Sequence, residues 1–154
     1  MKQYLGVLHK FSEGPYQEPG VKRAPTLDDQ KRALNIFLRK CNGQLSKELV
    51  LDDGLITSQS GFDNLVSNNI SDGIIFFSIE SLRKANGFID IKLLGRLHKT
   101  FDNIFTILES ISITSRIEFE AIASRIIVNN ECAQRDSSED WKRLIQKLAV
   151  SLDF

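Results

Sequence analysis

The sequence predicts a single-domain α/β fold with three layers, in which helices cover both faces of a mostly parallel four-stranded sheet. The stretch 72–82, DGIIFFSIESL, contains a continuous apolar run in which neither face is polar, which is typical of a strand buried on both sides in a parallel sheet. Strand-like and helix-like segments also alternate through the first half of the chain, as right-handed crossovers between parallel strands require. A chain of 154 residues is the usual size of one domain. We therefore expect residues 1–112 to form the sheet with its crossover helices, and residues 113–154 to form two long C-terminal helices.

The first half of the chain is expected to supply three strands and two helices. The first helix is the best marked, because Thr26 can cap it and Asp28 and Asp29 follow in the first turn, where the helix dipole favours negative charge. It should end near Lys40, since Asn42-Gly43 is a stop signal. The strands are expected over 3–9, 44–51 and the apolar run within 72–82, and a short helix over 62–69.

The second half is expected to place one further strand, over 103–108, among three helices. Residues 88–99 and 115–134 keep apolar side chains at helical spacing. A final amphipathic helix is expected from Ser138. Two long helices exceed what one face of the sheet needs, so we expect one of them to make the contact of a homodimer. The apolar positions of the final helix are Trp141, Leu144, Ile145, Leu148 and Leu152.

The overall charge argues against nucleic acid as a partner of this chain alone. Twenty basic and twenty acidic residues cancel, and the pI is about 6.7. Cys41 and Cys132 lie far apart in sequence and belong to no CxxC or Cys/His cluster, which favours reduced, buried thiols, with a catalytic thiol or a disulfide as the alternatives. No leader peptide or membrane span is apparent, so we expect a cytoplasmic protein without membrane contact.

The candidate site lies beyond the carboxyl ends of the strands, where open parallel sheets bind ligands. Ser12 follows the first strand and could act as a nucleophile if Lys10 held the developing negative charge, although a serine in a turn is the alternative. Glu80 closes the central strand, either as a catalytic carboxylate or as an exposed one. Candidate ligand-binding residues are His9, Ser78, Lys84 and Arg125; each cation could also be surface charge, and His98 is expected to be solvated.

Known cofactor and metal motifs are missing from the sequence. Neither a GxxxxGK[ST] phosphate loop nor a GxGxxG dinucleotide loop occurs. No HExxH, HxH or clustered carboxylate pattern suggests a metal. We therefore expect no metal and no cofactor.

Three local strings resemble motifs of the catalytic domain of serine recombinases of the resolvase/invertase type, over about residues 3–130. That family has Arg-x-Ser after its first strand, Asp-Arg-Leu-x-Arg after its third, and Glu-Phe-Glu-Arg on its long helix. The resemblance implies a resolvase-like fold, with Ser12 in the place of the serine that attacks DNA, and it adds Glu120 to the ligand-binding candidates. The matching strings here are Lys10-Phe11-Ser12, Glu80-Ser81-Leu82-Arg83-Lys84 and Glu118-Phe119-Glu120-Ala121.

The departures from that family concern the arginines that grip the scissile phosphate. Lys10, Ser81, Lys84 and Ala121 stand in their places. A lysine lacks the planar fork of a guanidinium, and serine and alanine carry no charge. DNA strand exchange is therefore not expected.

The length and the layout of first strand, long loop and DGI-apolar-S-x-x-L string also resemble the sporadic carbohydrate cluster proteins. That resemblance implies a resolvase-like fold used in bacterial surface-carbohydrate biosynthesis. The leading hypothesis is a cytosolic protein that binds or acts on an anionic sugar-related metabolite, such as a sugar phosphate or nucleotide sugar, or contacts a partner biosynthetic enzyme. The alternatives are a recombinase-like DNA-acting protein or its inactive regulator, and a non-catalytic dimerisation module; whether the chain is an enzyme stays open.

Overall fold

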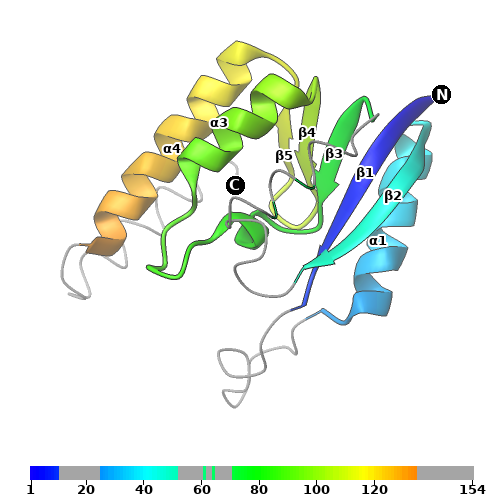
Figure 1. Cartoon of the computed structure of the whole chain (residues 1–154), viewed down its shortest axis with the longest axis horizontal. Helices are drawn as coiled ribbons and strands as arrows, with labels where there is room; N and C mark the ends of the chain where they lie inside the picture. The colour runs from blue at the N-terminus through cyan, green and yellow to red at the C-terminus, as the bar shows by residue number, and fades with distance from the viewer. Residues whose placement is uncertain (11–24, 52–60, 62–63, 65–70, 135–154) are drawn as a thin grey trace.

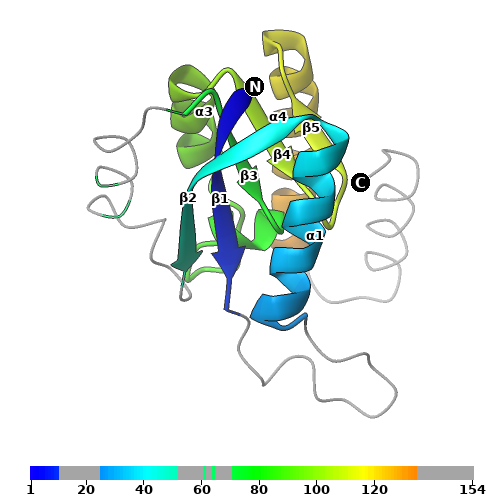
Figure 2. The same ribbon diagram turned by 90° about the vertical axis from the view of Figure 1, so that its right-hand side faces the viewer.

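The computed structural model describes residues 1–10, 25–51, 61, 64 and 71–134, and it forms three layers (Figure 1). The central layer is a five-stranded sheet of order β2-β1-β3-β4-β5. The first four strands in this order are parallel, and β5 is antiparallel to β4. Helix α1 covers one face and helices α3 and α4 cover the other (Figure 2). The elements are β1 (Lys2–His9), α1 (Leu27–Lys40), β2 (Gly43–Leu51), β3 (Gly73–Phe76), the short 3-10 helix η2 (Ile79–Leu82), α3 (Ile91–Thr100), β4 (Asn103–Thr106), β5 (Ile111–Ile113) and α4 (Arg116–Gln134).

The α/β fold with a mostly parallel sheet is confirmed, and β3 is its buried centre. All four residues of β3 are buried, between β1 on one side and β4 on the other. Ile74 and Phe76 belong to the core under α3 and α4, whereas Ile75 belongs to the core under α1. A Cβ at Gly73 would lie 2.8 Å from the carbonyl oxygen of Asn103 on the neighbouring parallel strand, so only glycine fits at this position.

The start and end of α1 follow the local sequence. The Thr26 side chain accepts a hydrogen bond from the Asp29 N–H, and the Asp29 carboxylate accepts one from the Thr26 N–H, which is a capping box. Beyond the helix, Asn42 has a φ of 53°, the left-handed conformation that asparagine tolerates. The predicted bounds of this helix are confirmed.

The sheet has a fifth strand where four were expected. β5 is three residues long and alternates buried Ile111, exposed Ser112 and buried Ile113, too short a run to give a periodic signal. It forms because β4 stops at Thr106, earlier than expected, and the chain reverses through Ser110 with a φ of 56°.

Three further expectations are corrected. Helix α3 begins at Ile91 instead of residue 88, because the Asp90 side chain caps it by accepting from the Leu93 N–H. Cys41 is exposed, since it lies at the end of α1; Cys132 is buried as expected. His98 is partly buried and stacks on the Phe119 ring, with 4.7 Å between ring centroids, because α3 packs against α4.

Some expected elements lie outside the described residues, namely most of the helix over 62–69 and the final helix from Ser138. The division of the chain at residue 113 extends into the same undescribed part. Among the helices that the structure describes, none has the length and apolar character needed to cross a membrane.

Candidate functional site

The carboxyl ends of β1, β3 and β4 meet at one edge of the sheet, which we call the carboxyl edge. Backbone hydrogen bonds continue past the strands there: the Phe77 N–H donates to the Val7 carbonyl at 3.0 Å, and the Leu108 N–H donates to the Phe77 carbonyl at 2.9 Å. The Lys10 N–H donates to the carbonyl of Leu51 at the end of β2, at 2.9 Å. The segments that follow these strands are therefore held side by side.

Glu109 joins the ends of β3 and β4. Its carboxylate accepts a hydrogen bond from the Ser78 hydroxyl at 2.7 Å and a second from the Ile79 N–H, also at 2.7 Å. Ser78 is fully buried, and its oxygen also accepts from the Glu80 N–H at 3.1 Å, which caps η2. Ser78, a predicted ligand-binding residue, thus makes structural contacts here. Nothing in the sequence near Glu109 forms a motif, so only its position after the fourth strand could have marked it.

Glu80 lies at the same edge, in an ion pair with Arg83. Arg83 Nη2 donates to Glu80 Oε1 at 2.6 Å, and Arg83 Nε donates to the other carboxylate oxygen. A third donor of the guanidinium bonds to the Gly87 carbonyl. Both side chains are partly exposed, and each neutralises the charge of the other.

The positions that match the family's arginines have different surroundings. Lys10 and Lys84 are exposed at the carboxyl edge. Ser81 is buried, and within the described residues its hydroxyl has no hydrogen-bond partner. Ala121 is exposed on α4. Among these four positions, only Lys10 and Lys84 place a charged group at the surface.

His9 and Lys10 are positioned by a buried glutamine that the sequence did not single out. The Gln30 side chain accepts from the His9 N–H at 3.0 Å and donates to the His9 carbonyl at 2.8 Å. It also donates to the Pro25 carbonyl at 3.2 Å. Gln30 therefore connects the two chain positions that flank residues 11–24, where Ser12 lies outside the described structure.

The structure does not bring Glu120 to the carboxyl edge. Asn130 exchanges two hydrogen bonds with the backbone of Ile89, at 3.1 and 3.2 Å, which places the second half of α4 beside the segment between η2 and α3. Glu120 lies ten residues earlier, about 15 Å along the helix, and pairs with Arg116 at 3.2 Å. Arg125 lies between them on α4 and is partly buried.

The described part of the chain contains no preformed metal-binding site. No group of three or more His, Cys, Asp or Glu side chains is close enough together there to hold an ion. The two carboxylates at the carboxyl edge, Glu80 and Glu109, are instead occupied by donors of the protein itself.

No family model matches this chain, and no curated protein matches it. Among solved structures, the N-terminal catalytic domain of TP901-1 integrase is similar, with a TM-score of 0.59 and 14% sequence identity. The match covers 84% of this chain and 95% of that domain. The carbohydrate cluster resemblance finds no support in these comparisons. At this identity the similarity concerns the fold alone, and the chain has a resolvase-like fold similar to that of a serine recombinase catalytic domain.

Proposed function

We propose that this chain is a non-cleaving relative of the serine recombinases, which acts as an inactive regulator through protein contacts. The observation that carries the proposal is that two positions of the family's arginines hold Ser81, which is buried, and Ala121. The fold similarity to an integrase catalytic domain supports the link to recombination.

The missing guanidinium groups weigh more than the ion pair. A partly exposed pair such as Glu80–Arg83 is worth only about 0–1 kcal/mol, so a phosphate could compete for Arg83. Hydrogen bonds from a charged group are worth roughly 1.5–3 kcal/mol each. Ser81 and Ala121 supply none of them, and phosphoryl transfer depends on such groups to stabilise the transition state. The proposal therefore rests mainly on these two positions.

DNA binding measured by fluorescence anisotropy over a range of salt concentrations tests this proposal. We expect weak binding by the full chain even at low salt. Glu80→Gln should remove the negative charge paired with Arg83, tighten binding and steepen the dependence of log K on log salt by about 0.9, the value of one phosphate contact. Glu120→Gln makes the same charge change and frees Arg116 away from the carboxyl edge, so it is the matched control. Tight wild-type binding with a slope of several contacts would argue for a DNA-acting protein.

An anionic small molecule at the carboxyl edge is the second candidate, with a sugar phosphate or nucleotide sugar as the class to test first. The exposed Lys10 and Lys84 favour it, because lysines bind phosphate as point charges. Thermal stabilisation by a panel of these compounds, lost in Lys84→Gln and kept in Lys99→Gln on α3, would support it. A panel without any stabilising compound, together with a partner protein in pull-down experiments, would leave the regulator as the better candidate.

A further inference from the structure

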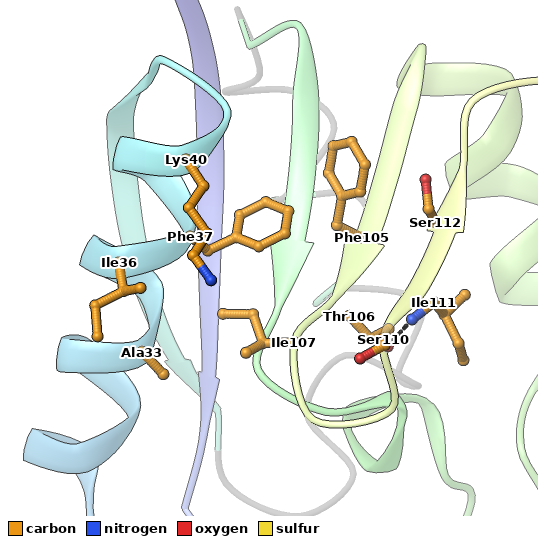
Figure 3. Close-up of a pocket in the computed structure, with 10 residues that line it drawn as sticks. All are labelled: Ala33, Ile36, Phe37, Lys40, Phe105, Thr106, Ile107, Ser110, Ile111 and Ser112. Carbon is orange, nitrogen blue, oxygen red and sulfur yellow. Dashed lines mark hydrogen bonds between the residues drawn. The ribbon is translucent and has the colours of Figure 1, made fainter. Parts of the chain in front are cut away.

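A groove of about 560 Å³ lies on the α1 face of the sheet, between α1 and the β4–β5 hairpin (Figure 3). Its volume falls within the range of about 300–1,000 Å³ that is usual for small-molecule sites. Ten residues of the described chain line it. Each side of a protein–protein interface contributes roughly 20–30 residues, so the size of this groove suits a small molecule better than a partner protein.

The interior of the groove is apolar because α1 covers only part of this face of the sheet. The main contacts of α1 are with β1 and β2, at the side of the sheet away from β5. The Phe37 ring reaches from α1 to Phe105 on β4, with 5.2 Å between ring centroids. Apolar side chains nevertheless keep contact with solvent: Ile36 is 53% exposed, and Phe105 and Ile107 are only partly buried.

Lys40 gives the groove a positive charge on its α1 side. Among the described residues that line the groove, Lys40 is the only one with an ionisable side chain, and it is exposed. Figure 3 shows this side chain turned back along α1 beside Phe37. None of the ion pairs within the described residues includes Lys40. Its charge is therefore available to a ligand in the groove.

Hydroxyl groups line the hairpin side of the groove. The Thr106 hydroxyl is buried and accepts a hydrogen bond from the Ile111 N–H at 3.3 Å, so it serves the turn into β5. Ser110 and Ser112 are exposed, and their hydroxyls can donate hydrogen bonds to an anion. This side of the groove therefore adds hydrogen-bond donors without adding a carboxylate that would compete for Lys40.

We infer that this groove binds a small hydrophobic carboxylate, such as a medium-chain fatty acid. The apolar part of the ligand covers Ile36, Phe105 and Ile107 and removes their exposed surface from water. The carboxylate pairs with Lys40, which would repel a cationic ligand of the same shape.

This site is separate from the carboxyl edge. Helix α1 begins at that edge, where Gln30 bonds to the backbone of His9, and it ends at Lys40. From Gln30 to Lys40 the helix rises about 15 Å. A ligand held by Lys40 therefore binds independently of Glu80, Ser81 and the other residues on which the proposed function depends.

Calorimetric titration of the full chain with decanoate, below the concentration at which it forms micelles, tests the inference. We expect saturable binding that weakens by up to about fourfold for each methylene removed from the ligand. Ile36→Glu puts a negative charge in the groove and should abolish binding. Val50→Glu, at a position of similar exposure on β2, is the matched control and should bind like the wild type. A wild type that does not bind decanoate, or equal binding by Ile36→Glu, would overturn the inference.

A charge reversal tests the role given to Lys40. The wild type should bind decanoate more tightly than decyltrimethylammonium, and Lys40→Glu should reverse this order. Lys40→Gln should weaken the binding of decanoate by about two- to fivefold, the value of an exposed ion pair. Lys99→Gln, also in the last turn of a helix, is the matched control and should leave it unchanged.

Two results would overturn the assignment of the carboxylate to this groove. One is the same order of affinities for the two amphiphiles in the wild type and in Lys40→Glu. The other is a wild-type dimer in light scattering that Ile36→Glu converts into a monomer, since a second copy of the chain would then occupy the groove.

Discussion

Glu109 is the residue on which the geometry of the carboxyl edge most depends. Its carboxylate accepts from a buried hydroxyl and from a backbone N–H, and both donors belong to the segment that follows β3. Contact with solvent weakens each hydrogen bond of a partly exposed carboxylate. Removing the carboxylate would nevertheless leave both donors unsatisfied, which costs free energy.

Glu109→Ala should therefore lower the free energy of unfolding by about 1–3 kcal/mol. Urea denaturation measures this change. The control is Glu131→Ala on the exposed side of α4, which should stay within about 0.5 kcal/mol of the wild type. Equal stability of the two variants would show that Glu109 does not hold the edge together.

Tyr4 predicts how stability changes at high pH. Burial raises the pKa of Tyr4, and the nearby Cys41 and Asp72 raise it further. The folded state therefore binds the phenol proton more tightly than the unfolded state does. This contribution to stability is complete below the unfolded pKa of about 10 and is lost as pH rises through the folded value.

Urea denaturation between pH 9 and pH 11 tests this sign. The wild type should lose more stability over this interval than Tyr4→Phe, which keeps the ring next to Phe105, 6.0 Å away between centroids. Parallel losses in the two proteins would mean that Tyr4 does not couple stability to pH.

At the scale of elements, Gln30 couples the start of α1 to the end of β1. Gln30→Leu keeps a similar volume but removes the two hydrogen bonds that Gln30 makes with the His9 N–H and carbonyl. The net loss of a hydrogen bond costs about 0.5–1.5 kcal/mol, so the variant should unfold at a lower urea concentration. Hydrogen exchange should report the same loss locally, as faster exchange of the His9 amide. Unchanged protection of that amide would contradict the role given to Gln30.

Helix α4 presents an exposed stripe that suits a second copy of the chain. Ile117, Ala121, Ser124 and Val128 follow each other at helical spacing and are all exposed, and Ile117 is 81% exposed. Light scattering at micromolar concentration should show a dimer, and Val128→Glu should give a monomer. Lys99→Gln, at an exposed position of α3, makes the same change in net charge and is the control outside this stripe. A monomeric wild type would rule out the predicted homodimer at that concentration.

The elements that the sequence predicted well are those with strong local signals. The apolar run of β3 and the caps of α1 depend on neighbours in sequence, and both are confirmed. β5 could not be predicted, because three residues give no period and their pairing with β4 depends on a turn. The same holds for the site: Glu109 contacts residues about 30 positions away, which no local pattern records.

At the scale of the whole molecule, the fold resembles that of a recombinase catalytic domain, but the side chains at the carboxyl edge differ from those of that family. The fold is similar to a recombinase catalytic domain, and the match covers 84% of this chain. At the end of β3, a buried serine and an internal ion pair stand where the family places an acid and arginines. We therefore propose that this chain does not cleave DNA.

An assay that detects covalent protein–DNA adducts tests this proposal most directly. The full chain is incubated with supercoiled plasmid, the reaction is stopped with detergent, and protein attached to DNA is measured for the wild type and for Ser12→Ala. We predict no adduct above background, with no difference between the two proteins. An adduct that forms with the wild type and disappears in Ser12→Ala would contradict the account, because it would show an active recombinase serine.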